Sequence, residues 1–183
     1  MNKLFLTKPL LKHKNEYEEM MDEWEKYGGR LHPGALRNYS DKQGKKVTFI
    51  EWLKWIEEDR SEENCPSGTV PQDLYFLVNK KERILGAITI RHYLDEKYTK
   101  NGGHFGVGIR PSERLKGYAS KMIELALVIA EKEYGIKNLI YTCDKDNIGS
   151  AKAIQNNGGV LLEEIMEDTG NIIQRYSLDL KRK

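Results

Sequence analysis

The sequence predicts an α/β (α+β) fold in which a mixed, mostly antiparallel central sheet is flanked by helices. From residue 70 onward, strand-like and helix-like segments alternate along the chain. An amphipathic helix over 118–134 lies between strand-like segments around 104–110 and 138–143, and a helical crossover of this kind joins parallel strands in a right-handed turn. The other strand-like segments follow one another through short turns, which indicates antiparallel pairing. We therefore expect a single domain over residues 1–183.

The N-terminal segment, 1–65, is expected to form a strand and two helices. The segment KLFLTKPLL is typical of a strand. Residues 15–27 and 48–58 carry apolar side chains at helical spacing, and Thr48 and Glu51 are placed to form a capping box. Core packing is favoured over cofactor stacking for the tryptophans of these helices, Trp24, Trp52 and Trp55.

The segment from residue 70 to the crossover helix begins with a hairpin. DLYFLVNK and RILGAITIRHY are rich in β-branched and aromatic residues, and a polar turn joins them. The next segment, GGHFGVGIRP, is a strand loaded with glycine, which indicates a bulge or the close approach of another backbone or a ligand. In helix 118–134 the residues expected to face the core are Met122, Ile123, Ala126, Leu127 and Ala130.

The last third of the chain continues the alternation. NLIYTCD is expected to be a short buried strand, and NIGSAKAIQNN a helix that ends at a glycine pair. GVLLEEIME and NIIQRYSLDL, joined by Asp168-Thr169-Gly170, are expected to close the chain as an antiparallel hairpin.

Composition and charge exclude several classes of protein. The 30 lysines and arginines nearly balance the 28 acidic residues, which argues against a dedicated nucleic-acid binder. The two cysteines have no spacing typical of a zinc site, so no metal is expected, and a reducing compartment is the simplest interpretation. No apolar run approaches the roughly 20 residues that span a bilayer, and the N-terminal segment lacks a signal-peptide pattern. The sequence predicts a cytoplasmic protein with no membrane partner.

The stretch IRPSERLKGYAS, residues 109–120, combines cationic side chains with a glycine just before the crossover helix. Backbone amides in the first turn of a helix lack intrahelical acceptors, and together with the helix dipole they attract phosphate groups. Gly117 allows a ligand to approach where a side chain would block it, and Arg114 and Lys116 add positive charge. The stretch is therefore interpreted as a pyrophosphate cradle, with a solvated helix start as the alternative.

The segment from Val107 to Ala119, VGIRPSERLKGYA, resembles the cofactor-binding motif of the GCN5-related N-acetyltransferase (GNAT) superfamily. In that motif a strand is followed by Arg/Gln-x-x-Gly-x-Gly/Ala at the start of a helix, and Arg114, Gly117 and Ala119 match the defining positions. Further on, DNIGSAKAIQNNGG is similar to the Asn-x-x-Ser/Ala segment of the family. The resemblance covers roughly residues 70–180 and is closest to uncharacterised bacterial members.

The resemblance implies transfer of an acetyl group from acetyl-CoA to a primary amine. The pantetheine arm is expected to pair with the backbone of Val107, Gly108 and Ile109, where the strand glycines leave room and a backbone N–H can stabilise the oxyanion. The pyrophosphate is expected beside Arg114 on the backbone amides of Leu115, Lys116, Gly117, Tyr118, Ala119 and Ser120. Asn147 and Ser150 match the family's cofactor-contacting segment; a plain helix N-cap is the alternative for Asn147, and the two roles can coexist.

Proton transfer is where the chain departs from the family pattern. Many relatives carry a tyrosine acid seven residues after the asparagine, and this chain has Ile154 there. His104 is the candidate catalytic base, because the ordinary pKa of histidine, about 6.5, lies near working pH; a structural strand histidine is the alternative. Tyr141 and Tyr176 are candidate substitute acids, with core packing as their alternative.

Two other functions remain open at this point. Because Ile154 stands where relatives carry a tyrosine acid, a non-catalytic CoA-binding sensor or regulatory module of the same fold is one alternative. A ribosome- or RNA-associated protein is the second alternative, and the near-neutral charge argues against it. The expected acceptor is a small-molecule or peptide amine, and the N-terminal helices of segment 1–65 and residues 93–103 are expected to shape its pocket. The chain is expected to be a monomer or homodimer.

Overall fold

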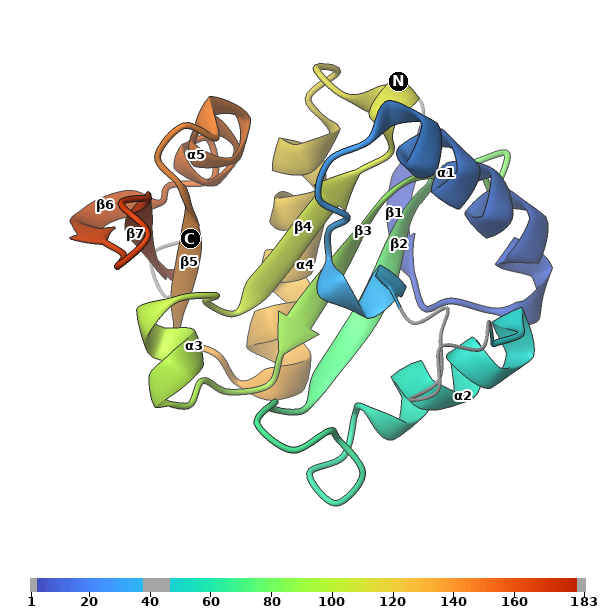
Figure 1. Cartoon of the computed structure of the whole chain (residues 1–183), viewed down its shortest axis with the longest axis horizontal. Helices are drawn as coiled ribbons and strands as arrows, with labels where there is room; N and C mark the ends of the chain where they lie inside the picture. Colours follow the sequence, from blue (N-terminus) through green and yellow to red (C-terminus); the bar gives the residue numbers. More distant parts are fainter. Residues whose placement is uncertain (1–2, 38–46, 181–183) are drawn as a thin grey trace.

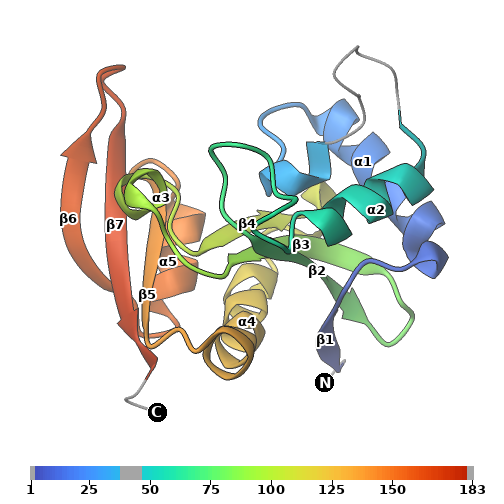
Figure 2. The same ribbon diagram turned by 90° about the horizontal axis from the view of Figure 1, so that it is seen from below.

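Two antiparallel sheets form the frame of the protein, a computed structural model that describes residues 3–37 and 47–180 (Figure 1). The first sheet has the order β1-β2-β3-β4 and the second the order β5-β7-β6. Figure 2 shows the second sheet standing at one side of the first. The strands are β1 (Leu4–Thr7), β2 (Gln72–Asn79), β3 (Ile84–Arg91), β4 (Phe105–Ile109), β5 (Asn138–Asp144), β6 (Val160–Met166) and β7 (Ile172–Asp179).

Helices cover both faces of the first sheet (Figure 2). Helices α1 and α2 lie on one face and enclose an aromatic core with β2 and β3, while α4 lies on the other face, against β1, β3 and β4. The helices are α1 (Lys14–Tyr27), α2 (Phe49–Glu58), α3 (Glu96–Lys100), α4 (Tyr118–Tyr134) and α5 (Ile148–Gln155). Short 3-10 turns occur at Leu11–His13, Gly34–Arg37 and Pro111–Glu113.

Several expectations about local structure are confirmed. The five residues of α4 expected to face the core are all buried. The capping box of α2 is formed, with the Glu51 amide donating to Thr48 Oγ1 (3.2 Å) and the Thr48 amide donating to Glu51 Oε2 (2.7 Å). Satisfying these two amides stabilises the start of the helix.

The prediction for the tryptophans is confirmed for two of the three. Trp52 is buried, stacks on Tyr17 at 4.4 Å between ring centroids, and donates its indole N–H to the carbonyl of Ala35 (3.0 Å). Trp24 is also buried. Trp55 is only half-buried, so its core packing is not confirmed. The reason is its position on the margin of the apolar face of α2, three residues after the fully covered Trp52.

The predicted parallel pair of strands is not confirmed as a ladder. Strand β4 pairs with β3, and β5 pairs with β7, both in antiparallel register. The two strands meet just before β4 begins, where the His104 amide donates to the Ile140 carbonyl (2.8 Å) and the Ile140 amide donates to His104 Nδ1 (3.0 Å). Beyond this junction β4 is the edge strand of its sheet.

Helix α1 is tied to the end of β4 by a buried arginine. The side chain of Arg110 is 2% exposed, and it contacts three carboxylates of α1. It reaches Glu16 Oε2 at 2.9 Å, Glu23 Oε1 at 2.6 Å and Glu19 Oε2 at 3.3 Å. Glu23 also accepts from the Ser112 hydroxyl (2.7 Å). These contacts fix α1 beside the turn that leads into α4.

None of the helices in the described ranges is long and apolar enough to cross a membrane. The cytoplasmic location and the single domain over residues 1–183 stay predictions.

Candidate active site

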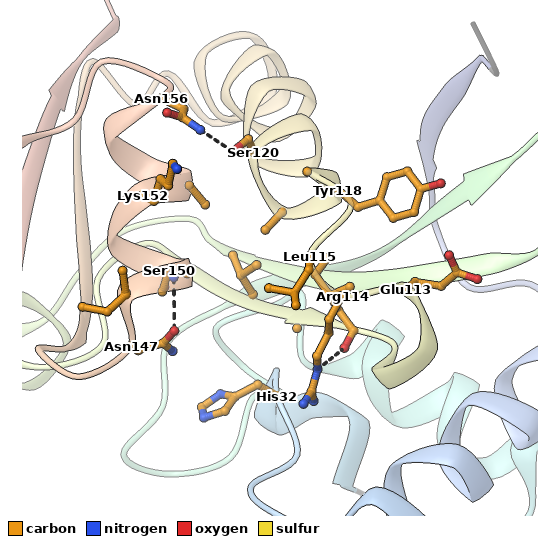
Figure 3. A pocket seen from close by; sticks show the side chains of 18 of the residues that line it. His32, Glu113, Arg114, Leu115, Tyr118, Ser120, Asn147, Ser150, Lys152 and Asn156 are labelled. Carbon is orange, nitrogen blue, oxygen red and sulfur yellow. Dashed lines mark hydrogen bonds between the residues drawn. The ribbon is translucent and has the colours of Figure 1, made fainter.

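A cavity of about 800 Å³ opens beyond the junction of β4 and β5. Its walls are the end of β4, the first turns of α4 and α5, and the loop that follows α1 (Figure 3). The side chain of Trp24 from α1 also lines it. The segments that the sequence predicts to bind the cofactor therefore meet at one place, although the end of β4 and the start of α5 lie far apart in the sequence.

The first turn of α4 has the features of an anion site. Gly117 is its N-cap in the left-handed region, with φ 79°, and no side chain caps the amides that follow. A Cβ on Gly117 would meet no protein atom within 4 Å, so the space beside it is open. Uncapped amides and the positive end of the helix dipole attract a phosphate at this point.

Leu115, two residues earlier, is also in the left-handed region, with φ 62°, and its side chain is fully exposed. A left-handed conformation costs a residue with a Cβ roughly 1 kcal/mol, and such strain is concentrated at ligand-binding turns. The turn thus presents an apolar side chain at the edge of the cavity.

Arg114 is held in place by aromatic and backbone contacts. Its guanidinium lies 4.4 Å from the ring centroid of Tyr27 and 5.3 Å from that of Trp24. Its Nε donates to the carbonyl of Ile109 (3.3 Å), as drawn in Figure 3. Stacking on α1 therefore fixes a positive charge in the wall of the cavity.

Polar contacts join α4 and α5 across the cavity. The Asn156 side-chain amide donates to Ser120 Oγ (3.1 Å), and the Asn157 side-chain amide donates to the Ser120 carbonyl (3.0 Å). Asn147 is the N-cap of α5, and its Oδ1 accepts from the Ser150 amide (3.1 Å), so its N-cap role is confirmed (Figure 3). Both Asn147 and Ser150 line the cavity.

The hydroxyl of Tyr141 lies 2.8 Å from Ser150 Oγ and lines the cavity with it. Burial raises the pKa of Tyr141 well above its usual range, so this hydroxyl keeps its proton at neutral pH. Tyr176, the other candidate acid, is buried outside the cavity and donates to Gln174 Oε1 (2.7 Å). Ile154 is fully buried and packs against Gly159 rather than facing the cavity.

The glycines of β4 accommodate a neighbouring backbone. A Cβ on Gly108 would lie 1.8 Å from the carbonyl oxygen of His32, and a Cβ on Gly106 would lie 3.2 Å from Cβ of Pro33. The expected close approach is therefore real, but the neighbour is the loop after α1. The alternative of a bulge is wrong for β4, because its register with β3 is regular.

The structure brings most of the predicted cofactor residues together, and besides Tyr176 it leaves Lys116 and His104 outside the lining. The predicted residues that line the cavity are Val107, Gly108, Ile109, Arg114, Leu115, Gly117, Tyr118, Ala119, Ser120, Asn147 and Ser150. Lys116 is not among the lining residues, and its ammonium contacts Glu113 Oε2 and the Ser112 carbonyl, both at 2.9 Å. Its role in cofactor binding stays a prediction.

His104 also lies outside the lining. It is 7% exposed, and its Nδ1 accepts the amide of Ile140. Burial is the main cause that lowers its pKa to about 4, and the charge of Arg91 acts in the same direction. The residue is therefore neutral at pH 7 and joins the two sheets; its catalytic role stays a prediction.

The sequence did not single out several residues of the cavity wall. Trp24, for which core packing was favoured over cofactor stacking, also lines the cavity, and Arg30 and His32 reach it from the loop after α1. The loop sequence GGRLHPGAL could have indicated these residues. It places an arginine and a histidine in a glycine- and proline-rich loop between two predicted helices, and loops often carry functional residues. The other lining residues are Glu113, Asp146, Ile148, Gly149, Lys152, Ala153 and Asn156.

Comparisons with known proteins agree with this geometry. Residues 8–160 match the family model described as an acetyltransferase (GNAT) domain, so the likeness begins well before the expected residue 70. No curated protein matches the sequence. Among solved structures, a dodecameric spermidine N-acetyltransferase from Vibrio cholerae has a TM-score of 0.64 at 11% identity, over 98% of this chain and 95% of that chain.

Two further bacterial structures are similar over nearly their whole length. An N-acetyltransferase from Staphylococcus aureus Mu50 has a TM-score of 0.61 at 16% identity, over 97% of this chain and 99% of that one. A GNAT-family acetyltransferase from Bacillus anthracis has a TM-score of 0.59 at 16% identity, over 100% of this chain and 98% of that one. At these identities the solved structures show the fold, and the family model covers most of the chain: the protein belongs to the GNAT acetyltransferase family.

Proposed function

We propose that the protein is an N-acetyltransferase that binds acetyl-CoA in the 800 Å³ cavity and transfers the acetyl group to the primary amine of an acceptor not yet identified. The observation that carries this proposal is the uncapped start of α4 at Gly117, which opens into the cavity beside the stacked Arg114. A helix start of this kind suits a phosphate group, and it coincides with the position of the family motif.

The chemistry of the walls fits coenzyme A. The amides of 115–120 and Arg114 suit the pyrophosphate, and Lys152 on α5 adds a positive charge. The exposed side chains of Leu115 and Ile148 offer apolar contact for the pantetheine arm. Because β4 is an edge strand beyond its junction with β5, its outer backbone groups at 107–109 are placed to pair with the pantetheine amides.

Acetyl transfer requires an amine that has lost its proton and a thiolate that can leave. Because the raised pKa of Tyr141 keeps its hydroxyl protonated, the hydrogen-bonded Tyr141–Ser150 pair is suited to donate one hydrogen bond to the sulfur. A tyrosine with so high a pKa is a poor acid toward a thiolate, whose conjugate thiol has a pKa of about 8.5. The pair therefore stabilises the leaving group without surrendering a proton.

Replacing Tyr141 with phenylalanine is expected to lower kcat by only about 2- to 10-fold, the equivalent of one hydrogen bond of roughly 0.5–1.5 kcal/mol. The Kd for CoA, measured by calorimetry, should stay unchanged, because the ring remains in place. Tyr176→Phe is the matched control, since its hydroxyl contacts Gln174 away from the cavity. A loss of 100-fold or more in Tyr141→Phe would instead make this hydroxyl an obligatory acid.

The charge of the described cavity lining argues against carrying over the acceptor named for the Vibrio cholerae structure. That protein is described as a spermidine N-acetyltransferase. Here the lining includes Arg30, Arg114 and Lys152 against only Glu113 and Asp146, and Glu113 is already paired with Lys116 and Arg83. A polyamine binds best to a surface of opposite charge. We therefore leave the acceptor open.

Release of thiol on mixing the protein with acetyl-CoA and a panel of amines tests the proposed function. The panel should include neutral, anionic and polyamine acceptors. Thiol release that requires both an amine and the protein supports the enzyme. Tight CoA binding without thiol release from any amine would instead favour the CoA-binding sensor. The monomer or homodimer expected from the sequence stays a prediction as well.

A further inference from the structure

His32 is the one histidine among the described residues that line the cavity. It lies in the loop between α1 and the 3-10 turn at Gly34–Arg37, and its side chain is half-buried. In Figure 3 the imidazole projects from this loop towards the α5 side of the cavity, where Asn147 and Ser150 lie. The ring therefore faces the space enclosed by the segments assigned to acetyl-CoA.

The backbone of His32 is fixed against the cofactor strand. Its carbonyl oxygen occupies the place that a Cβ of Gly108 would need, at a distance of 1.8 Å from that Cβ position. The next residue, Pro33, lies against Gly106 in the same way, and Trp24 Cη2 would be 2.9 Å from the Gly108 Cβ. This packing holds the α-carbon of His32 beside residues 106–108, along the strand assigned to the pantetheine arm.

The other ionisable groups of the cavity are poorly suited to accept a proton near pH 7. Arg30, Arg114 and Lys152 carry their protons already. Although burial acts to raise the pKa of Glu113, hydrogen bonds from Lys116 and Arg83 hold it below its usual range. The remaining members are Tyr118, Tyr141, whose pKa is raised by burial, and Asp146, which is exposed in the turn before α5.

Resting on the proposed function, we propose that His32 is the general base of the reaction, taking a proton from the acceptor ammonium at the face of β4. Imidazole accepts one proton from the R–NH₃⁺ group, and the neutral amine then attacks the acetyl carbon. The new N–C bond forms as the C–S bond breaks, and CoA leaves as the thiolate. The second nitrogen proton neutralises that thiolate, and His32 releases the first to water, so R–NH₃⁺ and acetyl-CoA give the amide, CoASH and H⁺.

Substitution of His32 by glutamine is the first test, with any amine that gives thiol release in the wild-type protein. General-base catalysis typically contributes about 10²–10⁴-fold, so kcat/KM at pH 7 should fall by at least about 100-fold. The acidic limb of the pH–kcat/KM profile, set by the base, should disappear, while CoA affinity should stay unchanged. Imidazole added to His32→Ala should restore part of the rate, which a purely structural role would not produce.

Two other histidine substitutions make the result decisive. His92→Gln is the matched control, because His92 contacts Asp73 (2.8 Å) outside the cavity, and it should keep the wild-type profile. His104→Gln tests the assignment that the sequence favours. Loss of the acidic limb in His104→Gln with a wild-type profile in His32→Gln would overturn the proposal and return the role to His104.

A second measurement needs no acceptor. The ring Hε1 resonance of His32, identified by its absence in His32→Gln, is followed by proton NMR. The protein is saturated first with CoA and then with a non-reactive acetyl-CoA analogue that has a methylene between sulfur and carbonyl. The His32 resonance should differ between the two complexes and that of His92 should not. An unchanged His32 resonance with bound analogue would reject the proposal, whereas failure of both ligands to bind would reject the proposed function itself.

Discussion

Replacing Gly117 with valine is expected to abolish CoA binding while the protein stays folded. Gly117 has φ 79°, where a β-branched residue is strained, and its open side is where we place the pyrophosphate. Valine would move the backbone out of this conformation or fill that space with its side chain. Losing two charge-assisted hydrogen bonds of about 1.5 kcal/mol each corresponds to a Kd increase of at least about 100-fold.

Gly135 supplies a matched control at the other end of the same helix. It is the C-cap of α4, has φ 64°, and a Cβ there would also meet no protein atom within 4 Å. Valine at either position therefore carries a similar conformational strain, of roughly 1–2 kcal/mol. Calorimetric titration with CoA should show loss of binding in Gly117→Val alone. Equal affinities in the two variants would mean that the phosphate site lies elsewhere.

The part of the cavity that we assign to the cofactor could be located from the sequence because its segments are contiguous in the chain. The strand β4, a cationic turn with Gly117 and the amphipathic helix α4 follow one another directly along the chain, and each local preference agrees with the structure that forms. Asn147 and Ser150 form a similar local unit at the start of α5. Local rules of capping and periodicity are sufficient for such segments.

The acceptor side was not predictable in the same way, because it depends on contacts between distant segments. The glycines of β4 indicated close approach, but nothing near them in sequence identifies the partner as His32, which lies in the N-terminal part of the chain. Lys116 looked available for a ligand, yet its ammonium contacts the carboxylate of Glu113, three residues earlier. His104 looked like an active-site base, and its contact with Ile140 appears only once β5 is placed.

The parallel pair, predicted from the helical crossover, is not confirmed as a ladder, and the reason is related. A strand–helix–strand pattern favours parallel neighbours, but it does not say how far they remain in contact. Here β5 takes β7 as its ladder partner along its whole length, while β4 and β5 separate after the His104–Ile140 junction. The separation is what leaves room for a cavity between them.

Removing the carboxylates around Arg110 is expected to lower the stability of the protein by several kcal/mol. In Glu16→Gln/Glu23→Gln, the guanidinium of Arg110 stays buried but loses its two shortest ionic contacts. Breaking a buried ion pair from one side typically costs about 3–5 kcal/mol, because the remaining charge is left without compensation. The free energy of unfolding, measured in urea, should fall by an amount in that range.

Arg110→Met should lower the free energy of unfolding by less than the double glutamine variant does, although it removes all of the same contacts. The reason is burial: Arg110 is 2% exposed, whereas the side chains of Glu16 and Glu23 are 30% and 29% exposed and can be hydrated once the arginine is gone. Glu25→Gln, on the exposed side of α1, is the control and should change stability by less than about 0.5 kcal/mol. A larger loss in Arg110→Met than in the double variant would contradict this explanation.

The same cluster predicts how the stability of the protein depends on pH. Burial acts to raise the pKa of Glu23, but hydrogen bonds from Arg110 and Ser112 outweigh it and lower the pKa to about 2. Because the folded pKa lies below the unfolded value of about 4.3, Glu23 stabilises the protein fully above that value, and the contribution is lost as pH falls through about 2. Wild-type protein should therefore lose stability between about pH 5 and pH 2, and Glu16→Gln/Glu23→Gln should lose less over the same interval because glutamine does not titrate. Parallel slopes for the two proteins in urea titrations at pH 5, 4 and 3 would show that the Arg110 cluster does not hold its carboxylates ionised.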